Sequence, residues 1–233
     1  MVMSDFVRNI SAIAAAVKDV DAVVHFAGVV GERACVIDTE QSWSINVDGS
    51  KAVLAAARAV TTARFIFIST CSNYGVANPS ELATEDTPLN PLSDYARAKV
   101  ECEKVVLAAA SPPASTVLRF GTICGLSGRM RFDLLVSEMA KKCARGESID
   151  IFSPDAWRPF LHIVDAARAP SSMFLSHRRI RPHDASSMSS ARITKNGALS
   201  SWRGAIFRTS RSFSRTRKLQ SAKNPAGTKP HQG

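Results

Sequence analysis

Short apolar runs that alternate with alanine-rich segments constrain the fold of this chain more than any other sequence feature. The clearest run is Arg64–Thr70, which is rich in β-branched and aromatic residues and breaks into the polar segment 71–75. Two similar runs, 21–28 and 115–120, each meet a glycine. Strands of this kind separated by helices predict an α/β fold with a doubly wound parallel sheet. In such a sheet the ends of these runs share one ligand-binding rim.

Helical patterns fill the intervals between the apolar runs. The predicted helices are 1–20, 41–60, 94–110 and 132–145, a short strand is predicted at 149–152, and 160–169 reads as a strand or turn that enters a helix. In the first of these helices Ile10, Ile13, Ala14 and Val17 fall on one face, which we expect to be buried.

The stretch Tyr95–Lys99 carries the first chemical signal. A phenol and an amine four residues apart share one face of a helix, and Ser93 just upstream is a suitable N-cap. The positive end of the helix and the ammonium of Lys99 both favour the phenolate, so we predict a lowered pKa for Tyr95. A general acid/base needs such a pKa. Taken alone, the pair also fits an ordinary surface contact.

Charge divides the chain into two parts. Of the formal net charge of +10, the segment 170–233 carries +12, with 13 Lys and Arg against the single acid Asp184, and the segment 1–169 carries −2. The basic segment is rich in serine and has no repeat, so it cannot bury enough apolar area to offset the entropy of ordering it. We therefore predict a domain at 1–169 and a disordered basic tail at 170–233.

Cysteine usage and hydropathy restrict the compartment. The five cysteines are scattered, with no C-x-x-C pair, which argues for a reducing cytoplasm and against a disulfide framework or a metal site. No apolar run reaches the roughly 18 residues of a membrane span, and residues 1–8 do not read as a secretory signal. We expect a cytoplasmic protein that binds no metal and no membrane.

Five motifs follow one another along the chain. They are His25-Phe26-Ala27-Gly28, Asn46-Val47-Asp48-Gly49, Ser69-Thr70-Cys71-Ser72-Asn73-Tyr74-Gly75, Tyr95-x-x-x-Lys99 and Arg158-Pro159-Phe160-Leu161-His162. With these motifs the chain resembles the NAD-dependent epimerase/dehydratase family, the extended short-chain dehydrogenases/reductases, over residues 19–169. The resemblance implies a Rossmann-like sheet that binds NAD, with NADP as an alternative, and a nucleotide-sugar substrate.

The resemblance assigns the catalytic roles. Tyr95 is the acid/base that takes the proton from a sugar hydroxyl as hydride passes to NAD. Lys99 is expected to hold the hydroxyls of the nicotinamide ribose and to keep the pKa of Tyr95 low. Thr70, 25 residues before Tyr95, occupies the place of the Ser or Thr that bonds the reacting hydroxyl. Without the pair at 95 and 99, Thr70 would read as a hydroxyl that ends a strand.

Binding residues follow from the same resemblance. Besides Lys99, the implied cofactor-binding residues are Phe26, Ala27, Gly28, Asn46 and Ser69. Tyr74 and Arg158 are implied to contact the substrate, with Arg158 on its diphosphate because a guanidinium fork suits phosphate oxygens. A surface pair of Arg158 with Asp155 or Asp165 is the alternative. His25 is expected inside the sheet and is assigned no chemistry.

Two departures from the family pattern affect the expected fold. The G-x-x-G-x-x-G fingerprint that brings a helix N-terminus onto the pyrophosphate is absent, and so is the acidic residue that would hold the adenosine ribose. We therefore expect a partial Rossmann-like sheet that lacks the first βαβ unit. Family-like sequence also stops near Ala169, where a change of reading frame or a genuine extension would produce the basic tail.

Two classes of function remain after these observations. The first is a nucleotide-sugar epimerase or dehydratase by ancestry, impaired in this chain, with negligible activity as isolated and a homodimer formed through helices 41–60 and 94–110. Positions 71–72 hold no carboxylic acid, which favours epimerisation or simple redox chemistry over dehydration. The second is a non-catalytic remnant whose cationic tail binds nucleic acid or anionic surfaces. That second class has little support, because the tail has few aromatic residues and no nucleic-acid recognition fold accompanies them.

Overall fold

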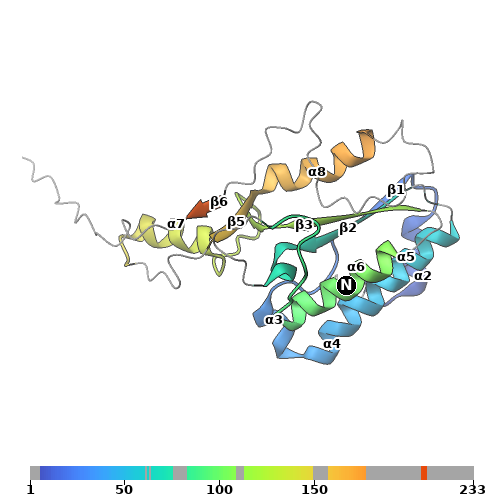
Figure 1. The fold of residues 1–233 in the computed structure, drawn as a ribbon, viewed down its shortest axis with the longest axis horizontal. Coiled ribbons are helices and arrows are strands. Elements are labelled where there is room, and N and C mark those ends of the chain that lie inside the picture. Colours follow the sequence, from blue (N-terminus) through green and yellow to red (C-terminus); the bar gives the residue numbers. More distant parts are fainter. Residues whose placement is uncertain are drawn as a thin grey trace, which may run out of the picture.

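The computed structural model describes residues 6–60, 62, 64–75, 83–108, 113–148, 157–176 and 206–208, and the statements below concern these residues. Figure 1 shows their arrangement. In chain order the elements are α2 (Ile10–Val17), β1 (Ala22–His25), α3 (Glu32–Ile37), α4 (Thr39–Trp43), η1 (Ser44–Asp48), α5 (Gly49–Ala59), β2 (Arg64–Thr70), η2 (Cys71–Tyr74), α6 (Asp94–Leu107), β3 (Ala114–Phe120), β4 (Thr122–Cys124), α7 (Leu135–Arg145), β5 (Trp157–His162), α8 (Ile163–Ser176) and β6 (Ile206–Arg208).

A three-stranded parallel sheet in the order β1-β2-β3 forms the centre of the molecule. Val24 of β1 pairs with Ile66 of β2, and Ile66 pairs with Thr116 of β3. A second small sheet has β4 and β5 parallel, with β6 antiparallel to β5. The predicted α/β fold with a parallel sheet is confirmed.

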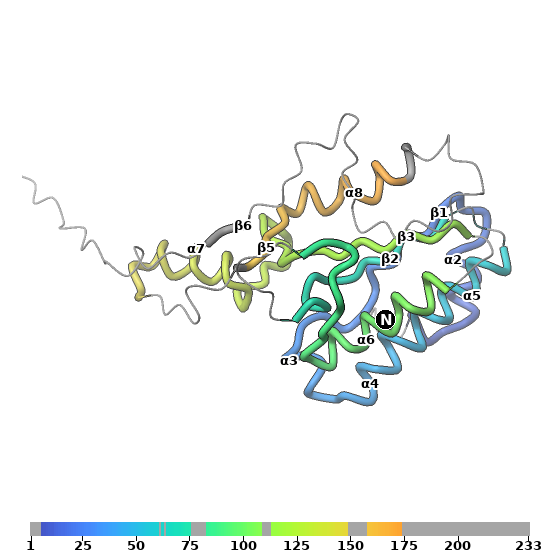
Figure 2. The backbone as a smooth tube through the Cα atoms, in the orientation of Figure 1, coloured from blue at the N-terminus to red at the C-terminus, as the bar shows by residue number. Residues whose placement is uncertain are grey.

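Alternating side chains of β2 face two different helical layers. Phe65 and Phe67 join a core cluster with residues of α2, α5 and α6, whereas Ile66 and Ile68 join a cluster with α8. Figures 1 and 2 show this layering, with α8 on one side of the strands and α2, α5 and α6 on the other. Because both faces are covered, β2 is buried along nearly its whole length.

The predicted helix 41–60 is interrupted by the π-helical turn η1, which lies between α4 and α5. Two side chains bond the carbonyl oxygen of Asn46 within this turn. Ser50 Oγ donates to it at 2.5 Å and Cys102 Sγ at 3.2 Å. A π turn is rare and occurs often at functional sites, and here it brings the side chain of Asn46 toward β1.

One expectation for the first helix requires correction. Ile13 and Val17 are buried as predicted, but Ala14 is exposed and Ile10 is 74% exposed, since α2 begins at Ile10 after its N-cap Asn9 and this first residue lies off the core. At the other end, α8 runs to Ser176 and crosses the predicted boundary at 169–170. Within the predicted tail, Ile206–Arg208 forms β6 on the edge of β5.

Some predictions fall outside the described residues. The strand at 149–152 and the other residues of 177–233 lie there, as does the end of the helix predicted to reach residue 110. The function proposed for the cationic tail therefore stays a prediction. Among the described residues, no helix has the length and apolarity to cross a bilayer, and no group of His, Cys, Asp and Glu could hold a metal ion.

Candidate active site

Helix α6 carries the phenol–amine pair at the end of the central strand. Ser93 caps the helix, as predicted, with its Oγ accepting from Ala96 N at 3.2 Å. Tyr95 consequently lies in the first turn, and Lys99 follows one turn later with its side chain buried. The sequence predicts both the start of this helix and the shared face of the two residues.

The ammonium of Lys99 binds the end of β2 rather than the phenol. Its Nζ donates to Ile68 O at 2.9 Å and lies 4.7 Å from the ring centroid of Phe67. The distance from Nζ to the ring centroid of Tyr95 is 6.0 Å. Burial lowers the pKa of Lys99. An ammonium has three N–H donors, so two remain after the bond to Ile68, and a vicinal diol would use both.

The pKa of Tyr95 is shifted in the direction opposite to the prediction. Burial raises the pKa of Tyr95 to about 12, nearby Cys35 raises it further, and Arg131 lowers it. The prediction that Lys99 and the helix end lower the pKa of Tyr95 is wrong. The reason is that the desolvation of the ring outweighs both effects, and the ammonium is used on Ile68.

Thr70 ends β2 at the same rim, two residues after the carbonyl that Lys99 binds. Its Oγ1 accepts from Ser72 N at 3.1 Å and donates to Ser72 Oγ at 3.2 Å, which makes Thr70 the N-cap of η2. Thr70 thus has the strand-ending role. Its role toward a reacting hydroxyl stays a prediction.

Asn46 fixes the loop that follows β1. Its side-chain amide is buried and makes a paired contact with Val29, accepting from Val29 N at 2.7 Å and donating to Val29 O at 3.0 Å. A Cβ at Gly28, which has φ +156°, would come within 2.6 Å of Asn46 Oδ1. The loop thus needs glycine here, and Asn46 is not the solvated helix residue that its position allowed.

The other residues of the first motif differ in exposure. Phe26 is 47% exposed, and its ring centroid lies 6.4 Å from that of Phe120. Ala27 packs against the core. His25 is buried and bonds Ser50 Oγ at 2.8 Å, which supports the structural role assigned to it.

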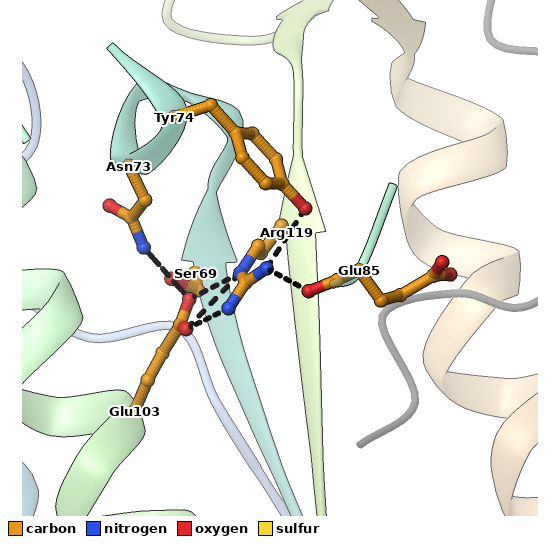
Figure 3. A network of polar contacts seen from close by, with 6 residues as sticks. All are labelled: Ser69, Asn73, Tyr74, Glu85, Glu103 and Arg119. Carbon is orange, nitrogen blue, oxygen red and sulfur yellow. Dashed lines mark hydrogen bonds and ion pairs between the residues drawn. The ribbon is translucent and has the colours of Figure 1, made fainter. Parts of the chain in front are cut away.

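Two predicted binding residues already have intramolecular partners. Ser69 Oγ donates to Glu103 Oε1 at 2.5 Å, and the hydroxyl of Tyr74 accepts from Arg119 Nη1 at 2.9 Å (Figure 3). Arg158 lies on β5 in the second sheet with an exposed side chain. The bond of Lys99 to Ile68 O thus holds the helix that bears Tyr95 against the strand that ends at Thr70, whereas Arg158 lies on a different element.

Sequence reasoning missed the charged pair beneath this rim. Glu103 of α6 and Arg119 of β3 form a buried ion pair at 2.6 Å. A signal existed, because Glu103 continues the spacing of four residues from Tyr95 and Lys99. Arg119 is likewise the one charged residue in the strand 114–120.

Comparisons with known proteins identify the family of this chain. Residues 6–185 match the model of the family described as the NAD dependent epimerase/dehydratase family. UDP-glucose 4-epimerase of Streptomyces lividans is 26% identical over 164 residues, 64% of this chain. The match spans 49% of that relative, about half of its length.

Two solved structures have a similar fold. MoeE5 in complex with UDP-glucose and NAD is 27% identical with a TM-score of 0.60, covering 67% of this chain and 53% of that one. TunA, an NAD-dependent NDP-hexosamine 5,6-dehydratase involved in tunicamycin biosynthesis, is 28% identical with a TM-score of 0.61. The match to TunA covers 69% of this chain and 53% of that one. The similarity thus extends to proteins of both epimerase and dehydratase type.

Proposed function

Because the chain belongs to the NAD-dependent epimerase/dehydratase family, we propose that it performs redox chemistry of the epimerase type on a nucleotide sugar. One observation carries the proposal. The bond from Lys99 Nζ to Ile68 O holds the helix that bears Tyr95 against the strand end that bears Thr70. A phenol, an ammonium and a hydroxyl at one rim are the groups that positioned proton transfer to a sugar hydroxyl requires.

NAD(P) fits the rim through the free donors of Lys99. The two N–H groups of Nζ that remain after the bond to Ile68 match the two hydroxyls of a ribose. Gly28 and Asn46 shape the neighbouring loop, and Phe26 offers an exposed apolar ring there. Ser69, whose hydroxyl is used on Glu103, would contribute its backbone. When bound, NAD supplies a nicotinamide ring that accepts a hydride and returns it.

Proton transfer in this proposal occurs at Tyr95 Oη. The pKa of about 12 keeps the phenol protonated near neutral pH, which is the form that donates a proton when the keto sugar is reduced. Oxidation of the sugar hydroxyl needs the phenolate as proton acceptor, and Arg131 is the cation that favours this form. Thr70 Oγ1 would exchange its bond to Ser72 Oγ for one to the sugar hydroxyl.

Epimerisation fits the residues beside Thr70 better than dehydration. Elimination of water needs a carboxylic acid at this position, and the residue here is Cys71, whose thiol stays protonated because burial raises its pKa to about 11. Its Sγ donates to Arg119 O at 3.3 Å. The similarity to UDP-glucose 4-epimerase supports the same choice. We further propose Arg158 and Tyr74 as substrate contacts, a homodimer through 41–60 and 94–110, and a cytoplasmic location.

In our proposal this chain has a low affinity for NAD. The 233 residues contain no G-x-x-G-x-x-G loop to bind the pyrophosphate. We therefore expect negligible activity at micromolar NAD and a rate that still rises with NAD at about 1 mM and above, where typical KM values end.

The test is the conversion of UDP-glucose to UDP-galactose at millimolar NAD. We expect Tyr95→Phe and Lys99→Met to lower the rate by about 10²-fold or more, the usual loss when positioned proton transfer is removed. Lys104→Met is the matched control, since this lysine of α6 is 69% exposed and should leave the rate unchanged. No conversion by the wild-type chain at any NAD concentration, or an unchanged rate in Tyr95→Phe, would contradict the proposal.

A further inference from the structure

A buried carboxylate lies one helical turn beyond the phenol–amine pair. Glu103 of α6 is almost completely buried and lies next to the ends of β2 and β3 (Figure 3). Its Oε1 accepts from Ser69 Oγ at 2.5 Å, from Asn73 Nδ2 at 2.8 Å and from Arg119 Nε at 3.0 Å. Its Oε2 accepts from Arg119 Nη2 at 2.6 Å. One side chain thereby joins a helix, a strand end, a turn and a second strand.

The donors to Glu103 flank the residues proposed to act on the sugar. Ser69 immediately precedes Thr70, and Asn73 immediately precedes Tyr74. Arg119 pairs with Ser69 in the sheet register, and its Nη1 donates to the hydroxyl of Tyr74. Through these contacts the carboxylate is linked, directly or through Arg119, to both ends of the segment from Ser69 to Tyr74.

Lys99 and Glu103 bind successive residues of β2 from the same face of α6. Lys99 Nζ donates to Ile68 O, and Glu103 accepts from Ser69 Oγ. These two hydrogen bonds fix the strand end, and with it Thr70, relative to the helix that bears Tyr95. Asn73 depends on the carboxylate as well. Among the described residues its Oδ1 has no partner, so its buried side chain is held only through Nδ2.

Stability alone gives a weak reason for this arrangement. The side chains of Arg119 and Glu103 are 4% and 3% exposed, and the desolvation of such a pair offsets most of its attraction. Apolar residues would fill the same space with equal or greater stability. A single defined geometry for the turn is what the ion pair and its neutral donors add.

We propose that Glu103 is a positioning residue, which sets Thr70 and Tyr74 against Tyr95 for the sugar reaction. The inference rests on the proposed function, because Thr70 and Tyr74 receive their roles from it. Glu103 acts through Ser69, Asn73 and Arg119 and touches neither substrate nor cofactor. Loss of its charge should displace the turn while the Lys99 contact to the cofactor ribose remains.

The variant Glu103→Gln tests this role because it keeps the shape and removes the charge. We expect kcat to fall about 10-fold or more, since small displacements of reacting groups cost rates of this order. The KM for NAD should change less than about 3-fold, because the Lys99 contact to the cofactor is not removed by this variant. Glu101→Gln is the matched control, because Glu101 lies on the same helix and pairs at the surface with Lys104. It should change neither constant.

A spectroscopic readout follows the turn without turnover. The chain has two tyrosines, so Tyr95→Phe leaves Tyr74 as the one phenol that titrates near 295 nm. In the wild type, burial and Glu103 raise the pKa of Tyr74 while Arg119 lowers it. Adding Glu103→Gln to Tyr95→Phe should lower the titration midpoint of Tyr74, because Arg119 then lacks its counter-charge.

The outcomes separate this inference from the proposed function. A folded Glu103→Gln protein with kcat within about 2-fold of wild type would overturn the inference. If the wild type converts no sugar, the proposed function fails. The titration of Tyr74 then tests the effect of Glu103 on the turn by itself, and an unchanged midpoint would overturn the inference. If Glu103→Gln does not fold, Asn73→Ala serves as the test instead. It removes one donor to Glu103 and leaves the ion pair with Arg119, and it should also lower kcat.

Discussion

Single residues of the site take their chemistry from burial more than from spacing. A charge near a helix terminus contributes about 0.3–1 kcal/mol, which is less than one pKa unit. The rise in the pKa of Tyr95 from 10.0 to about 12 corresponds to roughly 3 kcal/mol in the opposite direction. The spacing of Tyr95 and Lys99 thus predicts their proximity, and their environment decides which proton each one holds.

The buried His25 gives a stability prediction at the same scale. The hydroxyl of Ser50 donates its one proton to Asn46 O. In the hydrogen bond between Ser50 Oγ and His25 Nε2, the ring nitrogen is therefore the donor. Burial and then Lys99 lower the pKa of His25 from 6.5 to about 4. Between these two pH values the unfolded chain binds more protons than the folded one, so stability falls as pH decreases, by up to about 3 kcal/mol.

Urea unfolding between pH 7 and pH 4 measures this loss. His25→Gln, which keeps a donor for Ser50, should flatten the pH dependence. Equal pH dependence in His25→Gln and the wild type would show that another group titrates.

Some residue roles could be predicted from the sequence and others could not. The cap at Ser93 and the buried His25 follow from local pattern. The contacts of Glu103 with Ser69 and Arg119 depend on elements that are far apart in the chain, and local sequence holds no information on that distance. The same holds for the proximity of Cys35 to the Tyr95 phenol.

At the scale of elements, strands with apolar β-branched runs were the easiest to predict. β2 has the predicted bounds, since both of its faces are buried and its residue types match that environment. The π turn η1 was missed because its sequence, Ser44–Asp48, has ordinary helical periodicity. Its geometry depends on Ser50 and Cys102 bonding the carbonyl of Asn46.

The start of α6 can be tested as an element. Ser93→Ala removes the acceptor for Ala96 N and should reduce the free energy of unfolding by about 1 kcal/mol, the usual value of an N-cap. Ser93→Asp keeps an acceptor and should retain the stability. Urea denaturation measures both, and a loss of equal size in the two variants would contradict the capping role.

For the whole molecule, the alternation of strands and helices predicts the parallel sheet, and the structure and the family match confirm it. The pairing of β6 with β5 could not be predicted, because it joins segments separated by more than 40 residues and the sequence of β6 has no strand pattern of its own. The homodimer and the contact of Arg158 with substrate stay predictions. The chain spans about half of the S. lividans epimerase.

The central claim is that the sugar is oxidised by hydride transfer while Tyr95 moves the hydroxyl proton. The most direct measurement uses UDP-glucose deuterated at C4, incubated with the chain and millimolar NAD in ordinary water, with mass spectrometry of the UDP-galactose formed. Hydride transfer and return predict that deuterium stays at C4 and that the labelled sugar reacts more slowly. Loss of deuterium to water would mean that C4 is deprotonated instead, and the account of this site would be wrong.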